Sequence, residues 1–153
     1  MCSFLVCRKR GGLGKVIPGL DTIADKLKTR TLLIVEDNQG IRLWMRTLVA
    51  EAFPDFCIVE ATGGEEAVAL TLLHLPEVTL MDIGLPQMNG LEATWRIKAI
   101  VPQAHVVIVT NHGSPEYEEE ATRAGAYAYV LKKDISSRLI PVLRQIVTSG
   151  RLT

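Results

Sequence analysis

The chain has 153 residues, of which 48% are hydrophobic and 22% are charged, and its seventeen basic residues balance its seventeen acidic residues. This is the composition of an ordinary globular protein with room for one domain. The charge balance gives no global reason to expect binding to nucleic acid or to a membrane.

The first thirty residues predict an extension rather than a folded unit. Their short apolar stretch precedes the basic residues at 8–10, which reverses the order found in a signal peptide. GGLGKVIPG is typical of a loop, and only DTIADKLKTR (21–30) suggests a short helical turn. No run approaches the roughly 18 apolar residues of a membrane span. We therefore expect a flexible extension at 1–30, a domain at 31–150 and a tail at 151–153.

The cysteines bear on the cellular compartment. Cys2, Cys7 and Cys57 are odd in number and irregular in spacing, which is typical neither of a zinc site nor of a disulfide framework. This pattern favours a reducing, cytoplasmic location.

From residue 31 onward, continuous apolar runs alternate with amphipathic segments. The pattern first predicts a strand at 31–35 (TLLIV), a helix at 39–53, a strand at 56–61 (FCIVEA) and a helix at 65–75. Continuous apolar runs are typical of strands covered on both faces, whereas apolar residues three and four apart indicate helices.

The alternation continues to the end of the chain, with strands at 77–82, 105–110 and 127–132 and helices at 90–101, 115–124 and 136–150. Ser114 and Pro115 suit the start of the fourth helix and Gly125 its end. Pro141 lies near the first turn of the last helix, where proline does least harm. Five strands alternating with five helices predict a parallel sheet with helices on both faces.

In such sheets, ligands bind outside the carboxyl ends of the strands. Those ends carry Glu36, Asp37 and Asn38 on the first strand, Asp82 on the third, Thr110 on the fourth and Lys132 on the fifth. Three carboxylates, a hydroxyl group and an ammonium group are thus predicted to meet at one edge.

This set of groups restricts the chemistry. Three neighbouring carboxylates raise one another's pKa unless a cation is present, and oxygen ligands favour Mg²⁺ or Mn²⁺ over zinc. Such an ion usually accompanies phosphate. Lys132 would bind one phosphoryl oxygen and Thr110 another. Asp82 would be the nucleophile that forms an aspartyl phosphate.

Each of these residues also has an ordinary structural interpretation. Asp82 could cap the loop toward Pro86, Asp37 or Asn38 could cap the first helix, and Thr110 could simply end a strand. Their convergence on one edge favours the site. Lys132 and Lys133 point to opposite sides of a strand, so only one can enter the site, and we expect Lys132.

The motifs EDN, MDIGLPQMNG, VTNH and GAYAYVLKKD resemble the receiver (response regulator) domain of two-component signal transduction. TNH and GAYAYVLKKD are most similar to receivers of the LuxR/NarL-type response regulators. The resemblance implies an α/β, flavodoxin-like (CheY-like) fold: a doubly wound five-stranded parallel sheet, order 2-1-3-4-5, flanked by five helices. One departure is Lys133, where many receivers have proline.

The resemblance also implies a role for each site residue. Glu36 and Asp37 would hold Mg²⁺ (or Mn²⁺) with the backbone carbonyl of Ile83, and Asp82 would accept a phosphoryl group from a sensor histidine kinase. The phosphoryl-binding and switch residues would be Thr110, Lys132 and Tyr129, although Tyr129 could equally be a half-buried aromatic. Candidates for tuning dephosphorylation are Gly84, Gln87 and His112.

Such a domain catalyses only its own phosphorylation and dephosphorylation. The face formed by the fourth helix, fifth strand and fifth helix is the expected output surface, and it or the fifth helix is the candidate homodimer contact. We expect transcriptional control through a LuxR-type DNA-binding domain, attached or absent, with no nucleic-acid contact by this segment. The alternative is a stand-alone receiver or phosphorelay intermediate acting through protein–protein interaction.

Two enzyme or carrier classes fit the residues less well. A dehalogenase-type hydrolase needs a second acid two residues after the nucleophile, where this chain has Gly84. A flavodoxin needs a phosphate-cradling loop after the first strand, where Glu36 and Asp37 would repel phosphate.

Overall fold

Five parallel strands form one sheet in the order β2-β1-β3-β4-β5, which confirms the predicted topology. The structure is a computed structural model and describes residues 30–150. The expectations for the extension, including its helical turn up to residue 29, and for the tail lie outside the described residues. The strands are β1 (Arg30–Val35), β2 (Phe56–Ala61), β3 (Val78–Met81), β4 (His105–Thr110) and β5 (Ala128–Leu131).

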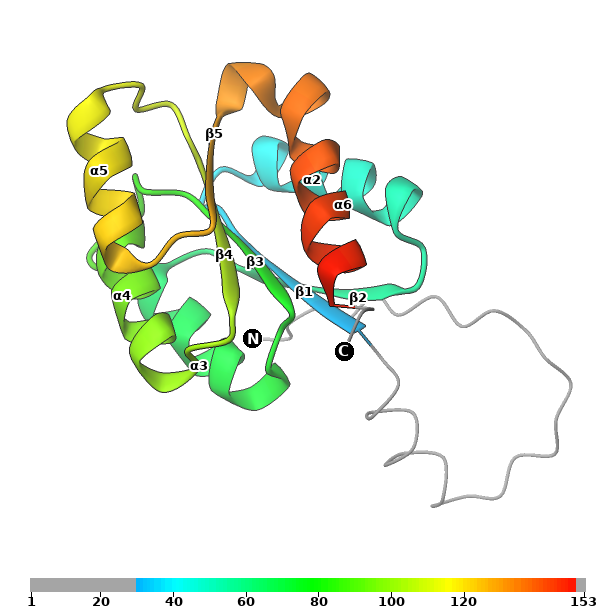
Figure 1. Cartoon of the computed structure of the whole chain (residues 1–153), viewed down its shortest axis with the longest axis horizontal. Helices are drawn as coiled ribbons and strands as arrows, with labels where there is room; N and C mark the ends of the chain where they lie inside the picture. The colour runs from blue at the N-terminus through cyan, green and yellow to red at the C-terminus, as the bar shows by residue number, and fades with distance from the viewer. Residues whose placement is uncertain (1–29, 151–153) are drawn as a thin grey trace, which may run out of the picture.

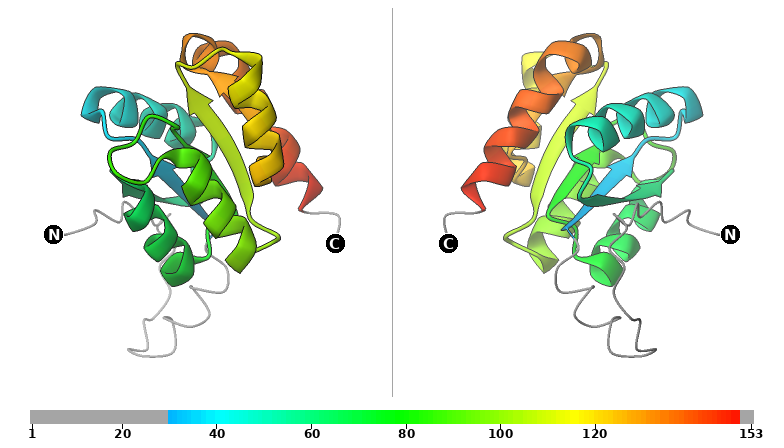
Figure 2. Two further views of the ribbon diagram at one scale, coloured as in Figure 1. Left: turned by 90° about the vertical axis from the view of Figure 1, so that its left-hand side faces the viewer. Right: turned by 90° about the vertical axis from the view of Figure 1, so that its right-hand side faces the viewer.

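Helices cover both faces of the sheet (Figures 1 and 2). On one face lie α3 (Gly64–His74), α4 (Gly90–Ile100) and α5 (Pro115–Ala124); on the other lie α2 (Gln39–Ala52) and α6 (Ile140–Ser149). None of the helices within residues 30–150 is long and apolar enough to cross a bilayer.

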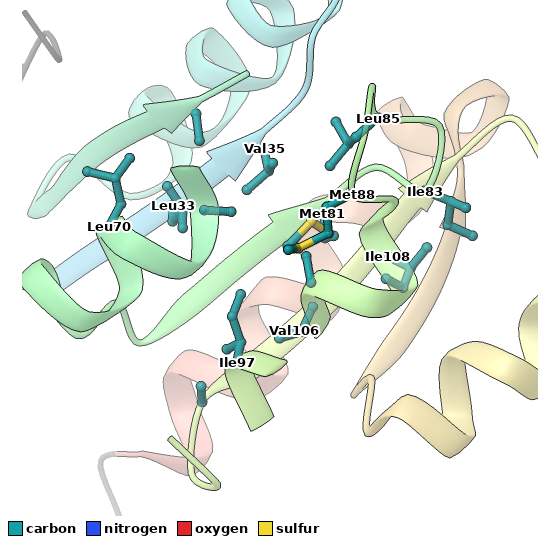
Figure 3. Packing of buried hydrophobic residues seen from close by; sticks show 14 of the residues in the cluster. Leu33, Val35, Leu70, Met81, Ile83, Leu85, Met88, Ile97, Val106 and Ile108 are labelled. Atoms are coloured by element: carbon teal, nitrogen blue, oxygen red, sulfur yellow. The ribbon is translucent and has the colours of Figure 1, made fainter. Parts of the chain in front are cut away.

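Each strand is a continuous apolar run because neighbouring residues pack into two different hydrophobic cores, one on each face of the sheet. In β1, Leu33 and Val35 face the core under α3, α4 and α5, whereas Leu32 and Ile34 face the core under α2 and α6. Figure 3 shows the first of these cores, where Met81 and Ile108 pack with Ile97 of α4. Burial on both faces is the reason that this sheet lacks an alternating polar pattern.

Most local signals act as predicted. Ser114 precedes Pro115 at the start of α5, and Gly125 ends that helix with φ 96°, in the left-handed region that glycine adopts easily. Asn38, one of the two candidate caps, caps α2, and Asn89, which was not predicted to do so, caps α4; each accepts a hydrogen bond from a backbone N–H group. β1 begins one residue earlier than predicted, and β3 and β5 end one residue before Asp82 and Lys132.

The prediction of one continuous helix over 136–150 is wrong. The chain turns through a 3-10 segment, η1 (Lys132–Asp134), and a π-helical segment, η2 (Ile135–Leu139), before α6 begins at Ile140. Pro141 has no N–H, and its ring collides with the carbonyl of residue 137 in a regular α-helix. A wider π turn at this point relieves that collision.

Candidate functional site

The carboxylates of Glu36, Asp37 and Asp82 meet at the carboxyl ends of β1 and β3. These strands are parallel neighbours, with Val35 paired to Met81, so the residues that follow them lie side by side. One oxygen atom from each of the three side chains lies within 4.8 Å of the others. The acidic cluster predicted from the strand ends is therefore present.

Glu36 is the deepest member of the cluster. The residue is fully buried, and its Oε1 accepts a hydrogen bond from the N–H of Asn38 at 3.0 Å. Among the described residues, the partner of Oε2 is the Lys132 ammonium, which lies 2.7 Å away in an ion pair. Burial raises the pKa of Glu36, although Lys132 and Asn38 act in the opposite direction.

Lys132 reaches the cluster from β5, past the end of β4. Its Nζ lies 2.9 Å from Asp82 Oδ2, to which it donates a hydrogen bond, and its side chain is 11% exposed. Burial acts to lower the pKa of Lys132, but the contacts with Glu36 and Asp82 outweigh it, so the pKa is raised. Lys133 is exposed. Of the two neighbouring lysines, the one expected to enter the site does so.

Thr110 and Tyr129 both contact the loop residue His112. The buried Thr110 hydroxyl accepts a hydrogen bond from the His112 N–H at 3.3 Å, and the Tyr129 hydroxyl donates one to the His112 carbonyl at 2.6 Å. Burial is the main cause that raises the pKa of Tyr129. The His112 ring packs on Tyr117, with ring centroids 4.7 Å apart. The two residues expected to switch thus hold one loop residue.

The loop after β3 gives a different result for Ile83. Its carbonyl accepts hydrogen bonds from Leu85 N at 2.8 Å and Gly90 N at 3.0 Å, so both acceptor positions are occupied. These two hydrogen bonds give no support for a role of this carbonyl in a metal shell, which stays a prediction. Gly84 contacts the proposed phosphoryl acceptor directly, since its N–H donates a hydrogen bond to Asp82 Oδ1 at 3.3 Å.

The other two candidates for tuning dephosphorylation, His112 and Gln87, lie in different places. A Cβ built on Gly84 would lie 3.9 Å both from Asp82 Oδ2 and from His112 Nε2, which places the His112 ring beside the acidic cluster. Gln87 instead lines a cavity of about 330 Å³ with residues 62–66 at the start of α3. Its position gives no support for a role beside Asp82.

Sequence reasoning missed two residues that support the site. Arg42 of α2 donates a hydrogen bond to the Glu36 carbonyl at 2.8 Å and pairs with Glu60 at 3.4 Å, which fixes the turn after β1. Gly90 begins α4 so close to the Asp82 backbone that an added Cβ would lie 1.9 Å from the Asp82 carbonyl oxygen. The MNG motif contained that glycine, but nothing in the pattern revealed this contact.

The donor set fits a hard divalent cation. Glu36 contributes a buried carboxylate and Asp37 an exposed one, and Asp82 adds a third that shares the Lys132 ammonium with Glu36. Oxygen ligands with room for water are what Mg²⁺ requires. The cluster is typical of a Mg²⁺ site.

Comparison with known proteins agrees with this geometry. Residues 32–144 match the family model of the response regulator receiver domain. The transcriptional regulatory protein PdtaR of Mycobacterium tuberculosis is 35% identical over 135 residues, which cover 87% of this chain and 64% of that protein. The chemotaxis protein CheY of Halobacterium salinarum is 30% identical over 120 residues, which cover 78% of this chain and 98% of that protein.

Solved structures show the same likeness. A DNA-binding response regulator of the LuxR family from Staphylococcus aureus is 31% identical with a TM-score of 0.71, covering 76% of this chain and 98% of that one. A LuxR-family two-component response regulator from Aurantimonas is 30% identical with a TM-score of 0.73, covering 79% of this chain and 86% of that one. The family match, the sheet order and the acidic cluster agree: the chain belongs to the response regulator receiver domain family, whose members are not conventional enzymes.

Proposed function

We propose that Asp82 accepts a phosphoryl group from the phosphohistidine of a sensor histidine kinase, with Mg²⁺ (or Mn²⁺) bound beside it. The observation that carries this proposal is the meeting of three carboxylates within 4.8 Å, two of which contact Lys132. A lone ammonium group cannot neutralise three carboxylates, so the cluster has capacity for a further cation.

Each site residue would have its own role in phosphoryl transfer. A carboxylate oxygen of Asp82 attacks phosphorus, the bond from phosphorus to the kinase histidine nitrogen breaks, and its electron pair stays on that nitrogen. Glu36, Asp37 and Asp82 would hold the metal ion, which supplies positive charge opposite the incoming phosphoryl oxygens. Because the Ile83 carbonyl is occupied, the carbonyl of Gly84 is the better candidate for a backbone ligand.

The signal would pass through His112. A phosphoryl group that draws the Thr110 hydroxyl toward Asp82 competes with the bond between Thr110 and the His112 N–H. The contact between Tyr129 and the His112 carbonyl is coupled to the same loop. The next helix, α5, buries only Ala121 fully, and weakly anchored elements move at low cost. We propose the face of α5, β5 and α6 as output or homodimer surface.

The output itself is proposed from relatives. PdtaR carries the name of a transcriptional regulatory protein, and the Staphylococcus aureus relative that of a DNA-binding response regulator. The chain spans 64% of PdtaR's length, so transcriptional control through a DNA-binding domain remains a proposal. A stand-alone receiver is the second candidate, favoured by the 98% coverage of the Halobacterium CheY. Either would act in the cytoplasm, where sensor kinases present their phosphohistidine.

Beryllofluoride, a phosphoryl mimic, tests the proposed site directly. With Mg²⁺ present it should raise the melting temperature and slow amide hydrogen exchange at 110–117, because it engages Thr110 and Lys132 at Asp82. The Asp82→Asn variant and a metal-free sample are the controls. An equal response in Asp82→Asn, or no response in the wild type, would contradict the proposal.

A further inference from the structure

The end of α3 carries an apolar surface that the receiver fold does not use. Leu72, Leu73 and Leu75 are 54%, 73% and 65% exposed, and Ile100 at the end of α4 is 49% exposed. Residues 67–76 contain no acidic or basic residue other than His74. A helix that is apolar on all sides is expected to be covered on all sides. We call these four side chains the leucine patch.

The four residues belong to two neighbouring helix ends. The helices α3 and α4 run side by side and end at the same edge of the sheet (Figures 1 and 2). Carbon atoms of Lys98 lie closest to Gly125, which places the Lys98 side of α4 toward α5. Ile100 follows two residues later, about 200° around the helix, and therefore points toward α3.

Leu75 adds an independent observation. It ends α3 with φ 46° and ψ 59°, a left-handed conformation that costs least for glycine or asparagine. Pro76 explains why the helix ends here, but not why a leucine is held in this conformation with most of its side chain exposed. Exposed contiguous apolar groups of this kind mark interaction surfaces.

The chain itself supplies a matching segment. Residues 20–28 read LDTIADKLK, in which Leu20, Ile23, Ala24 and Leu27 recur at the i, i+3, i+4, i+7 spacing of an amphipathic helix. Pro18 and Gly19 precede the pattern. The aspartates come early and the lysines late in it, which suits the helix dipole.

The first described residue, Arg30, is held close in sequence to the leucine patch. Arg30 forms an ion pair with Glu77, and the N–H of Glu77 donates to the Thr31 carbonyl at 2.8 Å. Leu75 is only two residues before Glu77. Leu27 is three residues before Arg30, so a chain that rises at most about 3.6 Å per residue easily reaches the patch.

A second surface near Arg30 is less suitable. Phe56, whose ring stacks under the Arg30 guanidinium at 4.7 Å, lines a groove of about 370 Å³ beside α2. Its walls Phe56 and Ile58 are already 7% and 4% exposed, so a covering helix would bury little there. The leucine patch offers far more apolar surface to remove from water.

We propose that residues 20–28 form an amphipathic helix that docks on the leucine patch, with Leu20, Ile23 and Leu27 against Leu72, Leu73, Leu75 and Ile100. The receiver domain then includes an additional helix across the ends of α3 and α4, at the edge of the sheet opposite Asp82. The proposal is independent of phosphorylation, since it uses none of the site residues.

Hydrogen exchange on the full 153-residue chain tests this contact from both sides. In the wild type, amides of 23–28 should exchange at least about tenfold more slowly than unprotected amides. The double variant Ile23→Asp, Leu27→Asp should lose that protection and speed exchange at 71–75. Leu72→Ser with Leu73→Ser should release 23–28 in turn.

Matched controls separate docking from general loosening. Leu13→Asp places the same charge in the same segment outside the repeat, and Leu43→Ser removes an equally exposed leucine from the opposite face of the sheet. Neither should alter protection at 23–28 or 71–75.

Three results would overturn the proposal. Unprotected amides at 23–28 in the wild type would show that the segment does not dock. A change at 50–58 rather than 71–75 in the double variant would place the segment in the groove. Conversion of a dimer to a monomer by the leucine substitutions, seen by light scattering, with 23–28 unprotected throughout, would assign the patch to a second copy of the chain.

Discussion

At the scale of single residues, the site holds more negative than positive charge. Glu36 and Asp82 share one ammonium group, that of Lys132, and Asp37 adds a further negative charge at the surface. The effect on the pKa is seen at Glu36, because this residue is fully buried. An excess of buried negative charge favours either a proton or a metal ion.

The pH dependence of stability should therefore report on Glu36. Its folded pKa is raised above the unfolded value of 4.5, so the folded protein binds a proton that the unfolded chain releases first. As pH rises from 4.5 through the raised pKa, metal-free wild type should lose stability. Glu36→Gln should lack this loss, as measured by urea unfolding in EDTA between pH 4 and 8.

Glu51→Gln, an exposed change on α2, is the control and should keep the wild-type pH dependence. Identical slopes for the wild type and Glu36→Gln would show that another group is responsible.

The rule that ligands bind at the carboxyl ends of strands located Glu36, Asp82 and Lys132 from sequence, because a residue's place at a strand end follows from the apolar run before it. The Ile83 carbonyl, in contrast, was expected only from the resemblance to receivers. Which carbonyl of a loop faces the site depends on that loop's own hydrogen bonds, here from Leu85 and Gly90 to Ile83. No periodic pattern encodes those bonds.

At the scale of elements, the approach of α4 to β3 sets where Asp82 lies. Gly90, the first residue of α4, touches the Asp82 backbone because it has no side chain. The strand, the loop and the helix are therefore held together by a contact that only glycine permits.

Gly90→Ala should cost about 3 kcal/mol of unfolding free energy, because the added Cβ must displace either the Asp82 carbonyl or α4. Gly63→Ala is a matched control: nothing lies within 4 Å of its Cβ position, and its loss should be about 0.5 kcal/mol or less. Urea unfolding midpoints compare the two variants. Equal midpoints would mean that the contact relaxes freely.

The C-terminal helix shows where element prediction reaches its limit. The apolar spacing located α6, and Pro141 was correctly placed near its start. The spacing did not reveal the 3-10 and π segments between Lys132 and Leu139. The sequence shows that Pro141 has no N–H group to donate. The conformation of the turn before it depends on the packing of Ile135 and Leu139, which are both fully buried.

At the scale of the whole molecule, metal binding should be coupled to folding. A cation that binds the native cluster and not the unfolded chain stabilises by mass action, by about 1.4 kcal/mol at a concentration ten times its dissociation constant. Thermal unfolding with increasing Mg²⁺ should show this rise in the wild type. In Asp37→Asn, which removes an exposed ligand without disturbing the core, the rise should require far more Mg²⁺. Identical Mg²⁺ dependence in the two proteins would exclude Asp37 as a ligand.

The overall architecture followed from sequence because each strand is an apolar run covered on both faces, as Leu32 and Leu33 show by entering different cores. Two global features did not follow. The contact of Lys132 with Glu36 as well as Asp82 depends on side-chain reach, and the exposure of Leu73 contradicts what an all-apolar helix predicts. Both depend on what lies beyond a single element.

Intact-mass analysis after incubation with acetyl phosphate is the direct test of phosphorylation at Asp82. With Mg²⁺, the wild type should gain one phosphoryl group, whereas Asp82→Asn and wild type kept in EDTA should gain none. An equal adduct on Asp82→Asn would move the acceptor elsewhere. No adduct on the wild type under any of these conditions would contradict phosphorylation at this site.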